Sequence, residues 1–107
     1  MQTIVINRRF GGFGLSAIGQ AEYKARTGMD VSGTVEFITR GGIPIWLTTD
    51  DIDRTCPALV AMVTEDSGLY SGRSAELGIV EIPDGVSWHV SSYDGLEHVA
   101  EDHRTWY

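Results

Sequence analysis

Residues 86–100 read Val-Ser-Trp-His-Val-Ser-Ser-Tyr-Asp-Gly-Leu-Glu-His-Val-Ala and contain the clearest structural signal in the chain. Apolar and polar residues alternate through its first half, which is the period of a half-buried strand. Asp94-Gly95 is a strong signal for a two-residue hairpin loop, because such loops need residues that tolerate positive φ. A loop of that length places Val90 opposite Val99. We therefore expect an antiparallel hairpin near the C-terminus.

Three further segments toward the N-terminus are expected to form strands. Residues 77–82 read as a strand, and the turn signal Pro83-Asp84-Gly85 joins it to the hairpin as a β-meander. Residues 3–7 are rich in β-branched residues, and their continuous apolar character predicts an inner strand buried on both faces. Residues 34–48 read as a loose hairpin, in which Pro44 confines its strand to an edge or a strand start.

Two helices complete the expected domain. Ser16 is a good N-cap for a helix over residues 17–27, and Gly28 is a typical C-terminal stop. Pro57 suits the first turn of a second helix over residues 57–65, because the N–H it lacks has no partner there. We predict one α+β domain over residues 1–107, a mostly antiparallel sheet with a C-terminal β-meander and two helices packed on one face.

Composition limits the classes of partner. The 107 residues include 15 acidic and 8 basic side chains, a formal net charge of −7. Direct nucleic-acid binding and association with an anionic membrane are therefore not expected, because both need basic surfaces. Cys56 is the only cysteine, so an internal disulfide and a thiolate zinc site are excluded and a reducing cytosol fits. No signal peptide or membrane span is recognised, and no cofactor is expected.

Four segments resemble a known family. They contain I-V-I-N-R-x-F-G-G-F-G-L-S over residues 4–16, Arg-x-x-Pro over 54–57, G-R-x-A-x-L-x-I-V-E-I-P-D-G-V-x-W over 72–88, and Y-D-G-x-E-x-V-A-E-x-H-R-T-W over 93–106. This pattern resembles a family of small uncharacterised proteins encoded mainly by bacteriophages and prophages. The resemblance covers well over half the chain, except for residues 27–53. It implies a viral or mobile-element setting and transfers no catalytic residue.

The glycine-rich segment after the first strand is the first candidate site. A strand, a glycine-rich loop and a helix start present free backbone N–H groups to an anion, and Arg8 and Arg9 stand just before the loop. The structural alternative is a tight connection packed under Phe10 and Phe13. The loop has neither a Walker A nor a dinucleotide-binding pattern. The candidate residues are Asn7, Arg8, Arg9, Gly11, Gly12, Phe13, Gly14 and Ser16.

The C-terminal tail is the second candidate. Arg104 has the geometry to bind phosphate, Trp106 to stack on a base, and His103 to titrate near neutral pH. The alternative is that Trp106 fills the core while Arg104 pairs with an acidic residue such as Glu101. The ligand hypothesis requires the tail and the glycine-rich loop to converge on one cationic pocket.

Metal binding and nucleophilic catalysis are less well supported. His89 and His98 are diagonal neighbours on the expected hairpin, but no third ligand shares their face, so no metal site is predicted. Cys56 precedes a helix start, where a thiolate is favoured, yet a lone cysteine there is more often a small buried apolar residue. Three acids before that helix, among them Asp53, usually just complement its dipole.

Three functions remain open, and binding without catalysis is favoured. The leading hypothesis is a phage-encoded accessory protein of the host cytoplasm, with a counter-defence or host-takeover role. It would bind either a host protein through its acidic surface or an anionic nucleotide-like ligand in its cationic pocket. The second is a small nucleotide-directed hydrolase or transferase with His103 or His98 as general base, oriented by Asp94 or Glu97. The third is a structural or oligomer-forming protein whose tryptophans mark an interface, and a homodimer would cover a free sheet edge.

Overall fold

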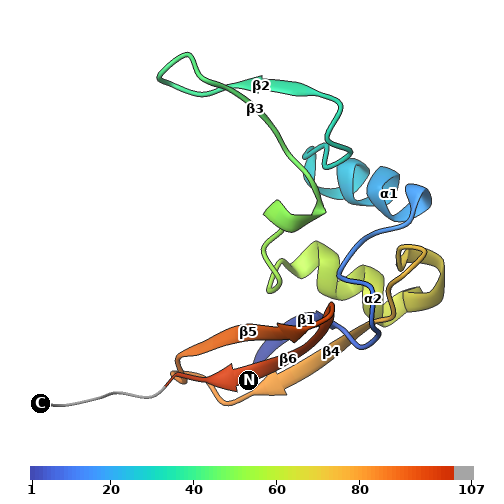
Figure 1. The fold of residues 1–107 in the computed structure, drawn as a ribbon, viewed down its shortest axis with the longest axis vertical. Helices are drawn as coiled ribbons and strands as arrows, with labels where there is room; N and C mark the ends of the chain where they lie inside the picture. Colours follow the sequence, from blue (N-terminus) through green and yellow to red (C-terminus); the bar gives the residue numbers. More distant parts are fainter. Residues whose placement is uncertain (103–107) are drawn as a thin grey trace, which may run out of the picture.

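The computed structural model describes residues 1–102, and strand β1 (Gln2–Asn7) lies below both helices in the view of Figure 1. Its last four residues are buried, and Ile4 and Val5 are completely inaccessible to solvent. The burial that its β-branched sequence predicts is therefore confirmed for residues 4–7, but β1 is not an inner strand, because it pairs with β4 alone. β1 pairs antiparallel with β4 (Leu77–Ile82), with Val5 opposite Ile79.

The C-terminal hairpin consists of β5 (Trp88–Tyr93) and β6 (Leu96–Glu101). Val90 lies opposite Val99, as the two-residue loop predicts, and both loop residues have positive φ, 49° for Asp94 and 86° for Gly95. The expected meander is reduced to this hairpin, because β4 pairs with β1 and not with β5. The reason is that β1 is the most buried strand, and pairing with β4 satisfies its backbone where no water reaches.

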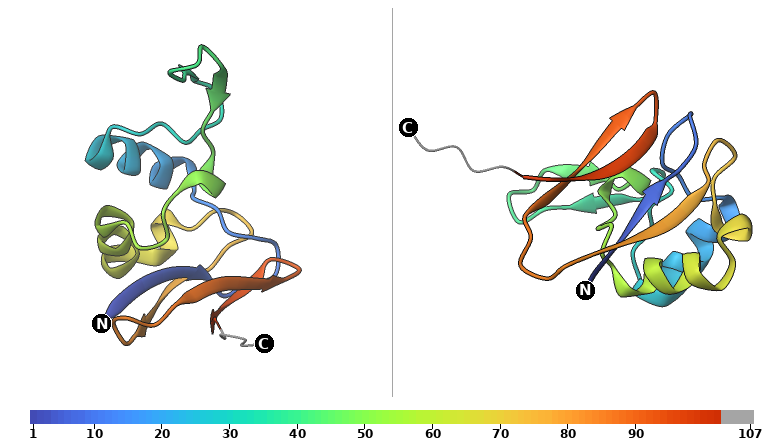
Figure 2. Two further views of the ribbon diagram at one scale, coloured as in Figure 1. Left: turned by 90° about the vertical axis from the view of Figure 1, so that its left-hand side faces the viewer. Right: turned by 90° about the horizontal axis from the view of Figure 1, so that it is seen from below.

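Two helices lie on one side of the β1–β4 pair in successive layers (Figure 2). Helix α2 (Pro57–Tyr70) packs directly on both strands, and helix α1 (Ala17–Thr27) packs on α2. α1 has the predicted bounds, and Gly28 ends it in the left-handed conformation, at φ 78°. α2 is longer than predicted, because the chain kinks at Asp66 and then makes a further helical turn.

The core lies between these layers. Its buried members come from β1, both helices, β4 and the segments that connect them. They are Val5, Leu15, Tyr23, Val31, Ile52, Leu59, Met62, Val63, Ala75 and Leu77. Gly19 allows the two helical segments to approach, since a Cβ there would lie 2.7 Å from the carbonyl oxygen of Tyr70. Arg26 of α1 also bonds Glu65 of α2 at 2.7 Å.

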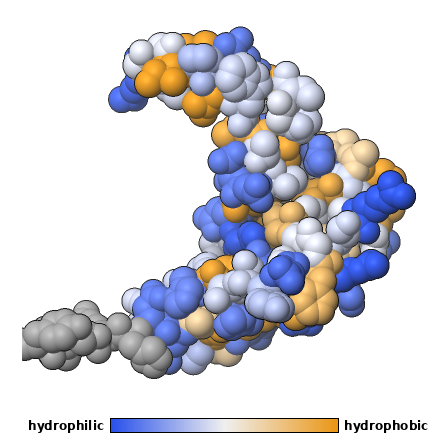
Figure 3. Space-filling view, in the orientation of Figure 1, coloured by the Kyte–Doolittle hydropathy of each residue, from blue (hydrophilic) through white to orange (hydrophobic). Residues whose placement is uncertain are grey.

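A second hairpin stands apart from these layers (Figure 1). It consists of β2 (Glu36–Ile38) and β3 (Pro44–Trp46), within the predicted loose hairpin, and a 3-10 turn, η1 (Thr49–Asp51), leads from it back to α2. We call residues 33–48 the arm. The arm and the β5–β6 end together give the molecule a crescent outline (Figure 3).

The predicted α+β class is confirmed, with two helices and six strands paired antiparallel in the described part of the chain. Neither of these helices has the length and apolar character that crossing a bilayer requires.

Candidate functional site

The glycine-rich loop is fastened to the turn of the β5–β6 hairpin. The Gly11 N–H donates to the carbonyl oxygen of Asp94 at 2.9 Å. Gly95 lies so close that a Cβ on it would be 2.1 Å from the nitrogen of Gly12. The buried Asn7 amide donates to the carbonyl oxygen of Gly95 at 2.7 Å and to that of Arg9 at 2.6 Å. These contacts give the loop a packing role, the alternative that its sequence left open.

Two polar side chains expected in the site bond to the protein's own backbone. Arg8 donates to the carbonyl oxygen of Ile79 at 2.7 Å. The Ser16 hydroxyl accepts from the first turn of α1 and donates to the carbonyl oxygen of Leu69 at 2.7 Å. Arg9 is exposed, and its side chain makes no hydrogen bond within residues 1–102. It is therefore the cation of the loop most accessible to a ligand.

The tail residues His103, Arg104 and Trp106 lie outside the described residues. Their convergence with the glycine-rich loop stays a prediction.

An ion pair that the sequence analysis missed joins the loop, β1 and β6. The Arg54 guanidinium binds both oxygens of Glu97, at 2.6 and 2.9 Å, and lies 3.6 Å from the ring centroid of Phe13. The two charged side chains are only 18% and 9% exposed. Both residues stand in the motifs quoted above, but nothing in those motifs links positions 43 residues apart.

The same pair completes the edge of β1 that faces away from β4. The Val5 N–H donates to the carbonyl oxygen of Arg54 at 2.8 Å, and the Arg54 guanidinium donates back to the Val5 carbonyl oxygen at 3.2 Å. The Asn7 N–H donates to the Glu97 carboxylate at 2.8 Å. Arg54 and Glu97 thus supply the partners that a neighbouring strand would supply.

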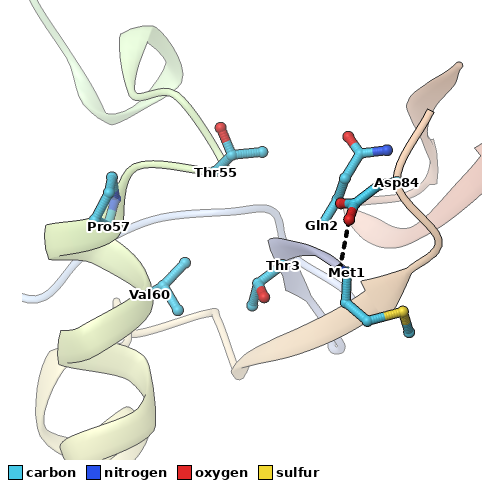
Figure 4. Close-up of a pocket in the computed structure, with 7 residues that line it drawn as sticks. All are labelled: Met1, Gln2, Thr3, Thr55, Pro57, Val60 and Asp84. Carbon is cyan, nitrogen blue, oxygen red and sulfur yellow. Dashed lines mark hydrogen bonds and ion pairs between the residues drawn. The ribbon is translucent and has the colours of Figure 1, made fainter. Parts of the chain in front are cut away.

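A hollow of about 490 Å³ lies beside the start of β1 (Figure 4). It is lined by Met1, Gln2, Thr3, Thr55, Pro57, Val60 and Asp84. Asp84 is the only charged side chain among them, and its carboxylate lies 3.0 Å from the N-terminal ammonium. The lining of the hollow contains no histidine, cysteine or lysine among the described residues.

The described histidines do not form the arrangement that the enzyme hypothesis needs. Glu97, one of the two carboxylates expected to orient a catalytic histidine, binds Arg54. The histidine that does have a carboxylate partner is His89, whose Nδ1 bonds Asp102 at the exposed end of the β5–β6 hairpin. His98 is exposed on β6. Sequence reasoning missed the His89–Asp102 contact, because it pairs a strand residue with one beyond the partner strand.

Cys56 lies against the core beside Tyr23. The Tyr23 hydroxyl is 3.8 Å from the Cys56 sulfur, and burial, with a smaller contribution from Cys56, raises the pKa of Tyr23 to about 12. A phenol that stays protonated at neutral pH is no base for the thiol. Within residues 1–102, no group of three side chains is placed to hold a metal ion.

The arm carries the densest group of exposed apolar side chains. Ile38 is 65% exposed, Ile43 63% and Trp46 52%, and Val35 and Ile45 are also exposed. Figure 3 shows apolar side chains gathered on the arm, away from the rest of the molecule. Single exposed apolar residues are ordinary, but a group of large ones typically marks an interaction surface.

Acidic side chains flank the base of the arm. Asp50 and Asp51 belong to η1, and Asp53 follows it, and all three are exposed on the segment that faces the hollow of the crescent (Figure 1). Hydrogen bonds from Thr55 hold the pKa of Asp53 below its ordinary value. The carboxylate of Asp53 therefore remains charged at neutral pH.

No known protein family, curated protein or solved structure matches this chain.

Proposed function

We propose that this protein is a small non-enzymatic binding protein that engages another protein through its arm. The observation that carries the proposal is the exposure of Ile38, Ile43 and Trp46 on one projecting hairpin. Tryptophan is among the residue types that contribute most to binding free energy when an interface buries them, and the exposed isoleucines add apolar area to be buried. The acidic residues beside the arm favour a partner with a basic rim.

The setting follows from the resemblance to phage-encoded proteins. In that setting the partner is a protein of the bacterial host, met in the host cytoplasm, and binding it serves counter-defence or host takeover. A partner face that normally binds nucleic acid suits the acidic surface, because a net charge of −7 attracts basic proteins at long range.

Two features favour protein binding over the other hypotheses. Within the described residues no histidine bonds a hydroxyl or a thiol, and Glu97 is held by Arg54. Anion binding at the loop must do without the Gly11 N–H and the Arg8 side chain, which bond to the protein itself. A nucleotide-like ligand at Arg9 remains the version of the binding hypothesis to be tested separately.

The test compares proteins captured from a bacterial lysate by three immobilised forms of the chain. These are the wild type, the arm variant Ile38→Glu/Trp46→Glu, and the control Ile18→Glu, whose site on α1 is 56% exposed. We expect quantitative mass spectrometry to find proteins held by the wild type and the control and lost from the arm variant. Equal capture by all three forms would refute the proposal, with circular dichroism confirming that each form is folded.

A further inference from the structure

The two edges of the arm differ in their ability to accept another strand. Within the described residues, the Thr39 N–H donates to the carbonyl oxygen of Ile43 at 3.0 Å. In an antiparallel ladder hydrogen-bonded pairs alternate, so Phe37 and Ile45 form the next such pair. The N–H and C=O groups of Glu36 and Ile38 therefore point outward from β2.

The outer edge of β3 is blocked. Pro44 has no N–H to donate, and proline on an edge strand is a device that discourages pairing. On the outer edge of β2, by contrast, Glu36 and Ile38 are both exposed. The alternation of the ladder turns their backbone groups away from β3, and no bond joins these groups to another segment within residues 1–102. One edge of the arm is therefore free to pair.

We propose that the outer edge of β2 pairs antiparallel with the β2 of a second copy of this chain. A two-fold axis through Phe37 places Glu36 opposite Ile38 of the second copy, and Ile38 opposite its Glu36. The outward N–H and C=O groups of both residues then find partners in the other copy. A second copy fits this edge because a two-fold symmetric contact uses the same surface on both copies, and the edge is complementary to itself.

Charge also favours a second copy on this edge. The arm contains one acidic residue, Glu36, and one basic residue, Arg40, so it is neutral in a chain whose net charge is −7. Two copies that meet arm to arm keep their acidic bodies apart. The register sets each Glu36 directly opposite an isoleucine and diagonally from the other Glu36, so the two carboxylates are not directly opposed.

The paired arms form one four-stranded sheet in the order β3–β2–β2–β3. Ile38 and Trp46 share a face of the arm, because residues two apart on a strand, and residues opposite on neighbouring strands, lie on the same side. Pairing joins the exposed apolar faces of both copies into one surface. This inference deepens the proposed function, since that joined surface becomes the site that engages a further protein.

The first experiment is sedimentation velocity over a range of concentrations. We expect the wild type to form a dimer, Ile38→Pro to remain a monomer, and Ile38→Thr to retain the dimer. The proline removes one outward N–H and leaves the ladder to β3 intact, whereas threonine keeps the edge and shortens the side chain. A monomeric wild type, or equal dimerisation of Ile38→Pro and wild type, would overturn the proposal.

The second experiment places a crosslink on the axis and does not depend on the proline variant. In a Cys56→Ser background, Phe37→Cys brings two thiols together at a non-hydrogen-bonded pair, where Cα atoms are about 4.5 Å apart and a disulfide fits. Ile45→Cys, on the same face but one strand from the axis, is the matched control. We expect mild oxidation to give a covalent dimer with Phe37→Cys alone. Equal crosslinking of both variants, or none, would contradict the register.

The failure of this inference is distinguishable from failure of the proposed function. A monomer whose capture of lysate proteins still depends on the arm would refute the second copy and leave the function standing. A dimer whose arm variants capture the same proteins as the wild type would refute the proposed function and leave the pairing with a second copy standing.

Discussion

Replacing Glu97 by alanine is expected to destabilise the fold more than removing an exposed paired carboxylate such as Glu22. The variant leaves the Arg54 guanidinium without its carboxylate and the Asn7 N–H without an acceptor. Removing one partner of a buried ion pair costs about 3–5 kcal/mol, and orphaning a buried N–H costs about 1–3 kcal/mol. The Arg54 side chain is 18% exposed, so water can partly replace the lost carboxylate and reduce this cost. We expect a total loss of about 3–5 kcal/mol.

Urea unfolding, followed by circular dichroism, measures this loss directly. Proteins of this size are stable by about 5–15 kcal/mol, so the effect removes a large share of the total. Glu22→Ala is the matched control, because Glu22 is 37% exposed and its partner Arg26 keeps Glu65. The control is expected to lose less than about 1 kcal/mol. Equal losses in the two variants would refute the argument that the Arg54–Glu97 pair completes the edge of β1.

Three further predictions concern the core, the glycine-rich loop and its exposed cation. The pKa of Tyr23 is near 10 in the unfolded chain and about 12 in the folded protein. The stability that this difference contributes is therefore fully present below pH 10 and is lost as the pH rises toward 12. Between pH 9 and pH 12 the free energy of unfolding, measured with urea, should fall by on the order of 2 kcal/mol more in the wild type than in Tyr23→Phe. Gly95→Ala should lower the melting temperature well beyond Gly85→Ala, because both glycines have positive φ but only Gly95 has a neighbour, Gly12, in the way. If the loop binds anions, nucleotides should raise the melting temperature of the wild type and not that of Arg9→Ala.

Each of these predictions has a result that would contradict it. Parallel stability profiles for wild type and Tyr23→Phe would mean that the buried phenol does not titrate as described. Equal melting temperatures for Gly95→Ala and Gly85→Ala would mean that the loop and the hairpin turn are not in close contact. If no nucleotide changes the melting temperature of the wild type, the hypothesis of an anionic nucleotide-like ligand is refuted. If nucleotides raise the melting temperature of Arg9→Ala equally, Arg9 is not part of the binding site.

Local signals in the sequence predicted much of the fold. The bounds of α1 follow from Ser16 and Gly28, which act on adjacent backbone groups. The register of the β5–β6 hairpin follows from Asp94-Gly95, because a two-residue loop leaves one alignment of the strands. In both cases the information lies within one element.

The pairing of β1 with β4 and the Arg54–Glu97 pair were not predicted. Each joins residues far apart along the chain, and the choice among several candidate strands or charges depends on how the layers pack. The kink at Asp66 was missed for a related reason, since its side chain bonds the Leu69 N–H and lets the helix resume. The loop glycines suggested a ligand, although the close neighbour of Gly12 is the chain itself.

Amide hydrogen exchange across the arm tests the central claim most directly, because it reports on single backbone groups. We expect Glu36 and Ile38, whose N–H groups point outward from β2, to become protected as the protein concentration rises. Phe37, already bonded within the arm, should change little. Rapid exchange of Glu36 and Ile38 at every protein concentration would contradict the claim that the arm pairs through β2 with a second copy.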